Sequence, residues 1–258
     1  MSTTPPADSL VELAARKQLP HHQFTDHATV RWIEANRPDF PKVSAYELPA
    51  ASQRLLYRSA IPVLWMAEPR LADSLHGVRH AMRTATLAAL LAEATGLSED
   101  DTATLIVAAA VHDCRRLHDK DDRGHGNRAA VWLTYNADAV WAHFGLAAAP
   151  RRIASAATAV RLHDVPYAAF TADDRTDHAH AERITDLLKA ADALDRYRLP
   201  KLTWWPDGSL VRAATVEVFE ALRATAFELV VASEAAHLAG LDSADAVFKA
   251  LDEWGLVS

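Results

Sequence analysis

Residues 103–113, ATLIVAAAVHD, carry the clearest structural signal in the chain. This stretch contains an uncharged apolar run, residues 105–111, and it ends on a histidine followed by an aspartate. Alanine is the best helix former and apolar runs belong inside a protein, so we predict a buried helix here. Burying a carboxylate without a partner costs several kcal/mol, so Asp113 requires a cation or strong hydrogen-bond donors. The stretch therefore predicts a polar site at the end of a core helix.

The rest of the chain has the composition of a helical protein. Only 8 of 258 residues are glycine, half are apolar and 24% are charged, which is typical of a globular chain. Apolar periodicity, proline and glycine breaks, and capping residues mark the helices. Besides the helix that Ser98 begins, we predict helices over 9–17, 26–36, 50–65, 77–95, 127–144, 150–163, 178–197, 210–239 and 243–254. No strand alternation is found, so the predicted fold class is all-α, a helical bundle.

Charge and cysteine content exclude several classes of protein. The 27 Lys and Arg against 34 Asp and Glu give a net charge of −7, which argues against a nucleic-acid binder. No window approaches 18 uncharged apolar residues, and the start of the chain lacks the features of a secretory signal, so we expect neither a membrane span nor secretion. A single cysteine, Cys114, fits a reducing compartment, and we predict a cytoplasmic protein. The oligomeric state is left open.

Histidine is enriched in the middle of the chain. Nine of the 13 histidines lie between residues 76 and 180. Helical spacing places His80, His112, Asp113 and Asp192 on or beside apolar, inward-facing stripes. Any one histidine alone is more easily explained as structural, but two imidazoles and two carboxylates together suit a divalent transition metal.

Four segments resemble a known family. They are HGVRHAMR (76–83), VHD (111–113), HDCRRLHDKDDRGHGNRAA (112–130) and KAADALDRYR (189–198). Together they are similar to the HD-domain superfamily of metal-dependent phosphohydrolases, over residues 75–200. The resemblance implies an HD-domain-like helical bundle that holds Mn, Fe, Zn, Co or Ni. It assigns the metal ligands to His80, His112, Asp113 and Asp192.

A second metal is a further implication of the resemblance. His125 and His163 fall where family members with two metals have additional histidines. Each has a simpler explanation, because His125 lies between two glycines where it can bond the backbone. His163 lies at a helix C-terminus, where the helix dipole favours a histidine. Both residues are kept as candidate ligands.

Charged residues near these ligands predict an anionic substrate. Arg83 and Arg115 are expected to bind phosphate, since guanidinium groups suit phosphate oxygens. Arg116, which shares the helical face of His112, is expected to act in catalysis. Asp119 or Asp122 would orient or deprotonate the attacking water. The alternative is that these arginines and aspartates form surface ion pairs, which contribute little.

The resemblance divides the chain into three regions and leaves three functions open. We predict an N-terminal helical extension over 1–70, a metal-binding core over 71–200 and C-terminal helices packed on it over 201–258. The favoured function is a metal-dependent phosphohydrolase acting on a small phosphorylated molecule, such as a nucleotide. The alternatives are a mixed-valent di-iron oxygenase of the same superfamily and a non-catalytic module that binds metal or nucleotide.

Overall fold

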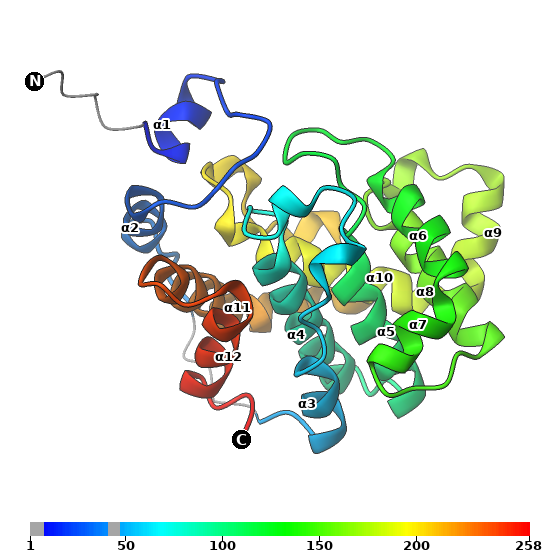
Figure 1. Cartoon of the computed structure of the whole chain (residues 1–258). Coiled ribbons are helices and arrows are strands. Elements are labelled where there is room, and N and C mark those ends of the chain that lie inside the picture. Colours follow the sequence, from blue (N-terminus) through cyan, green and yellow to red (C-terminus); the bar gives the residue numbers. More distant parts are fainter. Residues whose placement is uncertain (1–7, 41–46) are drawn as a thin grey trace, which may run out of the picture.

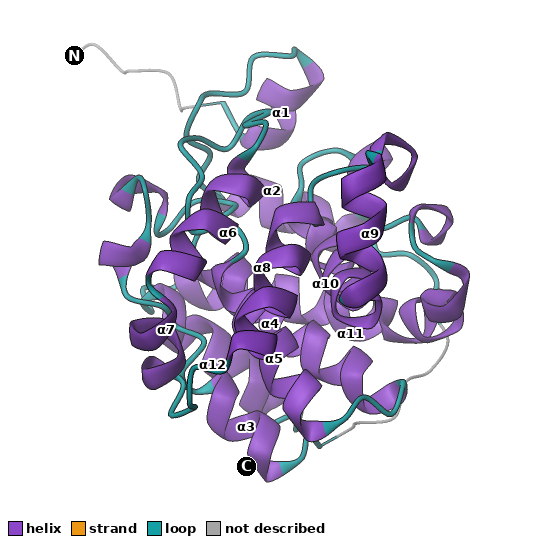
Figure 2. Cartoon of the chain, turned by 90° about the vertical axis from the view of Figure 1, so that its right-hand side faces the viewer, coloured by secondary structure: helices purple, strands orange, loops and turns teal. Residues whose placement is uncertain are grey.

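The computed structural model describes residues 8–40 and 47–258, and every regular element in these ranges is a helix (Figure 2). The predicted all-α class is confirmed. The first six α-helices are α1 Leu10–Ala15, α2 His27–Ala35, α3 Ala50–Leu56, α4 Val78–Ala94, α5 Glu99–Val111 and α6 His125–Tyr135. The next six are α7 Ala137–His143, α8 Pro150–Leu162, α9 Ala172–His180, α10 Glu182–Leu194, α11 Ala213–Leu238 and α12 Ser243–Glu253.

Short 3₁₀ turns complete the regular structure. They are η1 Val63–Trp65, η2 Pro69–Leu71, η3 Tyr167–Ala169, η4 Asp195–Arg198, η5 Leu202–Trp204 and η6 Gly208–Leu210. No helix of the described ranges is long and apolar enough to cross a bilayer.

Three predicted helices are wrong in their extent. The helix expected over 50–65 ends at Leu56, and Pro62 begins a separate 3₁₀ turn. The helix expected over 127–144 breaks at Asn136, which ends α6 and begins α7. The helix expected over 178–197 is two helices, since α9 begins earlier, at a Thr171 cap, and ends at His180.

The centre of the fold is formed by α4 and α5. Every residue of α5 from Thr102 to Val111 is buried, as the apolar run predicts. Helix α4 packs against α5, α10, α11 and α12, while α8 packs against α5, α6 and α10. Figure 1 shows α6–α9 on one side of this centre and α11–α12 on the other. Ile33, Leu56, Phe227 and Val247 belong to the same core, so all three predicted regions contribute to it.

A buried network of charges fixes α11 to α4. Arg79 and Arg83 of α4 both donate to the Glu234 carboxylate, and Arg83 also donates to Asp195 of η4, with Nε 2.6 Å from Oδ1. Burial would raise the pKa of Asp195, but Arg83 and a hydrogen bond from His80 lower it from 3.8 to about 2. Each buried charge is therefore compensated by a partner of opposite sign.

This network predicts a pH-dependent contribution to stability. Because the folded-state pKa of Asp195 lies below 3.8, its ionised form stabilises the fold above about pH 4. That contribution, about 2 kcal/mol for a shift of this size, is lost as the pH falls toward 2. Asp195→Asn should therefore reduce the free energy of unfolding strongly at pH 6 and by less at pH 3, as measured by urea denaturation. The exposed control Asp121→Asn should change the free energy of unfolding by the same amount at both pH values. If Asp195→Asn also differed from wild type by a pH-independent amount, this account would be contradicted.

Candidate metal centre

Six predicted ligands come from five helices and meet at one end of the bundle. His80 lies in the first turn of α4, and Asp192 lies in the last turns of α10. His112 and Asp113 follow directly on α5. The remaining two, His125 at the start of α6 and His163 directly after α8, close the group. The packing of these helices thus brings together residues up to 112 positions apart in the sequence.

The side chains form two adjoining groups. In the first group, the His80 Nε2 atom lies 3.0 Å from His112 Nε2, 3.4 Å from Asp192 Oδ1 and 3.5 Å from Asp113 Oδ2. His80 and His112 are fully buried, and the Asp192 side chain is 30% exposed. His80, His112 and Asp192 offer ligand atoms within 4.8 Å of one another, close enough to share one metal ion, and so do His112, Asp113 and His163.

The second group lies on the other oxygen of the same aspartate. Asp113 Oδ1 is 2.9 Å from His125 Nε2 and 3.4 Å from His163 Nε2, and the two Nε2 atoms are 3.0 Å apart. Asp113 therefore presents one carboxylate oxygen to each group. Its Oδ1 atom is buried and has no well-formed hydrogen bond within the described residues, so it lacks the partner that a buried carboxylate needs.

All four imidazoles are held in the tautomer that suits a metal ligand. Each Nδ1 atom lies 2.6–2.8 Å from an acceptor, so the proton resides there. The acceptors for His80, His112, His125 and His163 are Asp195 Oδ2, Ala109 O, Asp122 O and Val160 O, in that order. The Nε2 lone pairs then face one another across about 3 Å, an arrangement that repels unless a cation lies between them. Nitrogen and carboxylate donors of this kind fit a divalent transition metal.

The electrostatics favour the metal-binding forms of His112, Asp113 and Asp192. Burial lowers the pKa of His112 to about 3, so this imidazole is neutral at neutral pH. Burial would raise the pKa of Asp192, but His80, His112 and Arg198 lower it below its usual range. The pKa of Asp113 is likewise lowered, because Arg116 and the neighbouring imidazoles outweigh its burial. Burial would lower the pKa of His125, but the neighbouring Asp113 carboxylate raises it. Neutral imidazoles and ionised carboxylates are the species that bind metals.

Gly126 allows α6 and α8 to approach at the second group. A Cβ atom at this position would lie 2.7 Å from the backbone oxygen of Val160 and 3.0 Å from His163 Nδ1. The same Val160 oxygen accepts the hydrogen bond that orients His163. A glycine is therefore needed here for His125 and His163 to meet.

A cavity of about 150 Å³, which we call the metal cavity, opens onto these groups. Asp113, Asp192, His125 and His163 line it together with arginines from two different elements. Arg116 places Nη1 3.1 Å from His125 Nε2, and Arg198 of η4 places Nη2 3.5 Å from His80 Nε2. The cavity therefore combines metal-ligand atoms with cationic groups that can bind an anion.

Of the residues expected to act on substrate, only Arg116 lines this cavity. Asp119 lies behind it, where it accepts hydrogen bonds from Gln23 N, Ser74 Oγ and His76 Nδ1. Asp122 binds Arg128 and the backbone nitrogen of Leu117, so it shapes the loop that carries His125. The structure places neither carboxylate where it would touch a reacting water.

Arg83 and Arg115 also lie outside the cavity. Arg83 is three residues after His80, so it faces α11 and is fully buried in its ion pairs with Asp195 and Glu234. Arg115 points away from its neighbour Arg116 and donates to the backbone oxygen of Trp65. Both arginines hold parts of the fold together, and neither is placed to contact a phosphate in the cavity.

Sequence reasoning missed three charged cavity residues and undervalued His76. Asp164, Arg196 and Arg198 line the cavity, although the last two lie in the KAADALDRYR segment. His76, which by its position at a helix start suggests a cap, instead faces the cavity, with its ring 5.7 Å from that of His80. The signal for His76 and the arginines was their nearness to predicted ligands.

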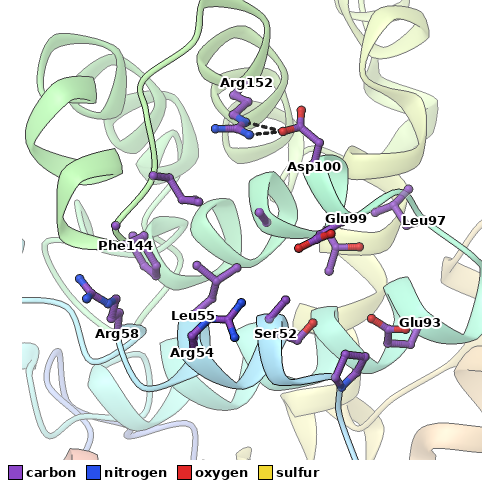
Figure 3. A pocket seen from close by; sticks show the side chains of 16 residues that line it. Ser52, Arg54, Leu55, Arg58, Glu93, Leu97, Glu99, Asp100, Phe144 and Arg152 are labelled. Atoms are coloured by element: carbon purple, nitrogen blue, oxygen red, sulfur yellow. Dashed lines mark hydrogen bonds and ion pairs between the residues drawn. The ribbon is translucent and has the colours of Figure 1, made fainter.

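The largest of the described cavities lies elsewhere. It has a volume of about 790 Å³ and is lined by residues such as Ser52, Leu55, Phe144 and Arg152 (Figure 3). Arg152 is paired with Asp100 there, and the lining contains no histidine. It shares no lining residue with the metal cavity, so size alone does not locate the candidate site.

Comparison of the chain with protein-family models, with curated proteins and with solved structures finds no match.

Metal content tests the two groups separately. Asp113→Asn should abolish metal binding, because this carboxylate faces both groups and its charge balances both. His125→Ala should retain metal in the first group and lower the total from two ions per chain to one. Elemental analysis of protein purified without chelator measures both, with His143→Ala as a control outside the cluster. Full metal content in Asp113→Asn would contradict the assignment.

Gly126→Ala should weaken metal binding by the second group, although Gly126 is not itself a ligand. The added methyl group meets a backbone oxygen that cannot move cheaply, so we expect a loss of about 1–3 kcal/mol in unfolding free energy and a loss of metal at His125 and His163. Gly96→Ala is the matched control, since its φ of +61° makes alanine unfavourable by about 1 kcal/mol with open space around it. If Gly126→Ala kept its full metal content, the close approach of α6 and α8 would be irrelevant to the site.

Proposed function

We propose that this chain is a metal-dependent phosphohydrolase of the HD-domain type that cleaves a small phosphate ester. The observation that carries the proposal is a cluster of six histidine and aspartate side chains, four of which line a cavity that also holds Arg116 and Arg198. A metal cluster beside guanidinium groups suits a substrate that is both hydrolysable and anionic. Buried Cys114 and the acidic net charge support a cytoplasmic enzyme that does not act on nucleic acid.

The ligand residues divide into two roles. His80, His112 and Asp192 would hold one divalent ion, and His125 with His163 would hold a second, with Asp113 between them. When bound, such an ion supplies Lewis acidity and lowers the pKa of water, which provides a nucleophile at neutral pH.

Two arginines would orient the phosphate. Arg116 is held by the backbone oxygen of Lys120, which receives its Nη2, and this leaves Nη1 directed at the cavity. Arg198 is anchored by the oxygens of Leu75 and Asp195. Guanidinium groups fixed in this way stabilise negative charge that develops on phosphoryl oxygens without having to reorganise.

His76 and Asp119 would move a proton. His76 Nδ1 donates to Asp119 Oδ1 across 2.9 Å, which leaves the Nε2 atom of the ring as an acceptor at the cavity. Burial lowers the pKa of His76 well below its usual value, and Arg116 and Arg198 add to this effect. His76 is thus neutral at neutral pH, although a weaker base than a free imidazole. Its Nε2 atom would accept the proton as water is activated, while Asp119 orients the ring.

Phosphate release tests the proposal directly. Metal-loaded protein should release phosphate from at least one member of a panel of phosphomonoesters, nucleotides and cyclic nucleotides. His76→Gln should lower kcat by about 10²–10⁴-fold and leave the metal content intact, because it removes a general base and no ligand. Asp119→Asn should lower kcat by less and shift the pH profile. No phosphate release from the panel, or an unchanged kcat in His76→Gln, would refute the corresponding step.

One observation also favours a second candidate function. Asp113 lies between two ligand groups, as the bridge of a di-iron oxygenase would. Oxygen consumption by protein loaded with iron alone, together with no activity in zinc or manganese, would select the oxygenase. The two cavity arginines make hydrolysis the better-supported alternative.

A further inference from the structure

A second, larger cavity adjoins the metal cavity. Its volume is about 760 Å³, and it shares His76, Arg116, Arg196 and Leu199 with the lining of the metal cavity. A molecule whose phosphate lies at the metal ligands would therefore extend past these side chains into the outer cavity.

The N-terminal segment forms one wall of this outer cavity. Lys17 and Leu19 line it from the turn after α1, and Gln23 lines it further along. The segment is held to the loop that carries Asp119. Gln23 N donates to Asp119 Oδ2 and Asp119 N donates to the backbone oxygen of His21, each across 2.8 Å. The wall thus keeps a fixed position relative to the metal site.

The outer cavity is cationic in a chain that is acidic overall. Five basic side chains line it, against two carboxylates, among the residues that the structure describes. Both carboxylates are engaged with other groups, because Asp119 accepts from His76 and Asp121 pairs with Arg123. The basic side chains are Lys17, Lys120, Lys201, Arg116 and Arg196. Such a concentration of positive charge, in a chain of net charge −7, is suited to an anion.

Lys17 occupies a position that favours glycine. Its φ of +59° lies in the left-handed region, and it is the only described residue other than glycine with a positive φ. Lys17 N donates to Ala14 O and Gln18 N donates to Leu13 O, which is the usual arrangement at a glycine that ends a helix. A lysine here is less favourable for the backbone than a glycine, so its amine at the cavity offers a reason for its presence.

The cavity of Figure 3 has no excess of positive charge. Three arginines line it, Arg54, Arg58 and Arg152, and the carboxylates of Glu93, Glu99 and Asp100 balance them. Arg152 is neutralised by its pair with Asp100, and Arg58 donates to the backbone oxygen of His143. Positive charge without a compensating carboxylate is thus a property of the outer cavity and not of cavities in this protein generally.

We propose that the outer cavity is a second anion subsite, which selects phosphate esters whose leaving group carries another phosphate or carboxylate. The inference rests on the proposed function, since it takes the metal cavity as the site of the reacting phosphate. Lys17, Lys120 and Lys201 bind the second anionic group, and Trp204 and Leu199 contact the carbon skeleton between the two groups. The N-terminal segment is therefore a specificity element.

Binding of two matched probes tests the subsite. Isothermal titration calorimetry on metal-loaded, full-length protein compares fructose 6-phosphate with fructose 1,6-bisphosphate, which differ by one phosphate. We expect the bisphosphate to bind at least tenfold more tightly, and this preference to shrink as salt is raised. Equal affinity for both probes would overturn the proposal.

Variants of the lysines test whether the outer cavity causes the preference for the bisphosphate. Lys17→Gly should keep or raise the melting temperature, since glycine suits the left-handed backbone, yet lower the preference for the bisphosphate at least threefold. The double variant Lys17→Gly/Lys201→Met should abolish the preference without changing affinity for the monophosphate. Lys249→Met, which removes an exposed lysine on α12, is the charge-matched control and should change neither. An unchanged preference in the double variant would overturn the proposal.

The outcomes separate this inference from the proposed function. A lysine-dependent preference for the bisphosphate, with no phosphate release, would support the anion subsite and refute hydrolysis. Phosphate release with no difference between the two probes would support hydrolysis and refute the subsite.

Discussion

The buried carboxylate of Asp113 imposes the constraint on which the site depends. It lies at the end of the buried helix α5, with one oxygen toward His80 and the other toward His125 and His163. A charge in that position needs cationic partners, and the imidazoles offer lone pairs that themselves need a cation. Arg116 lies 3.6 Å from Asp113 and compensates part of its charge, yet the Oδ1 atom has no hydrogen bond among the described residues. A metal between the nitrogens and the carboxylates would satisfy both demands together.

The surrounding fold supports this arrangement through hydrogen bonds to the opposite ring nitrogens. His112 and His163 donate to carbonyls within the last turns of their own helices, α5 and α8. His80 instead donates to Asp195, which belongs to the Arg83 and Glu234 network and so links the site to α11. Helix packing, fixed tautomers and ion pairing therefore act on the same atoms, and a change in α11 is transmitted to a ligand through Asp195.

The same structure separates two kinds of positive charge. Arg83 and Arg79 are buried against carboxylates and serve to hold helices together. Arg116 and Arg198 are anchored by backbone oxygens and line the cavity, although each also lies near one carboxylate, Asp113 for Arg116 and Asp195 for Arg198. Their guanidinium groups therefore face the cavity, whereas those of Arg79 and Arg83 do not line it.

The sequence predicted the all-α class and the core helix that ends directly before His112, because helical periodicity and residue type are local properties. It also predicted six candidate ligands, of which five form groups that could hold a metal ion and His125 lies beside them. It did not determine which neighbour of each ligand faces the cavity. Arg115 and Arg116 are adjacent, yet only Arg116 lines the cavity. Only the tertiary structure placed His76 against Asp119, and Lys17 and Lys201 around one cavity, since these residues lie 43 or more positions apart in the sequence. Distant contacts of this kind depend on how helices pack, and packing is a property of the whole core.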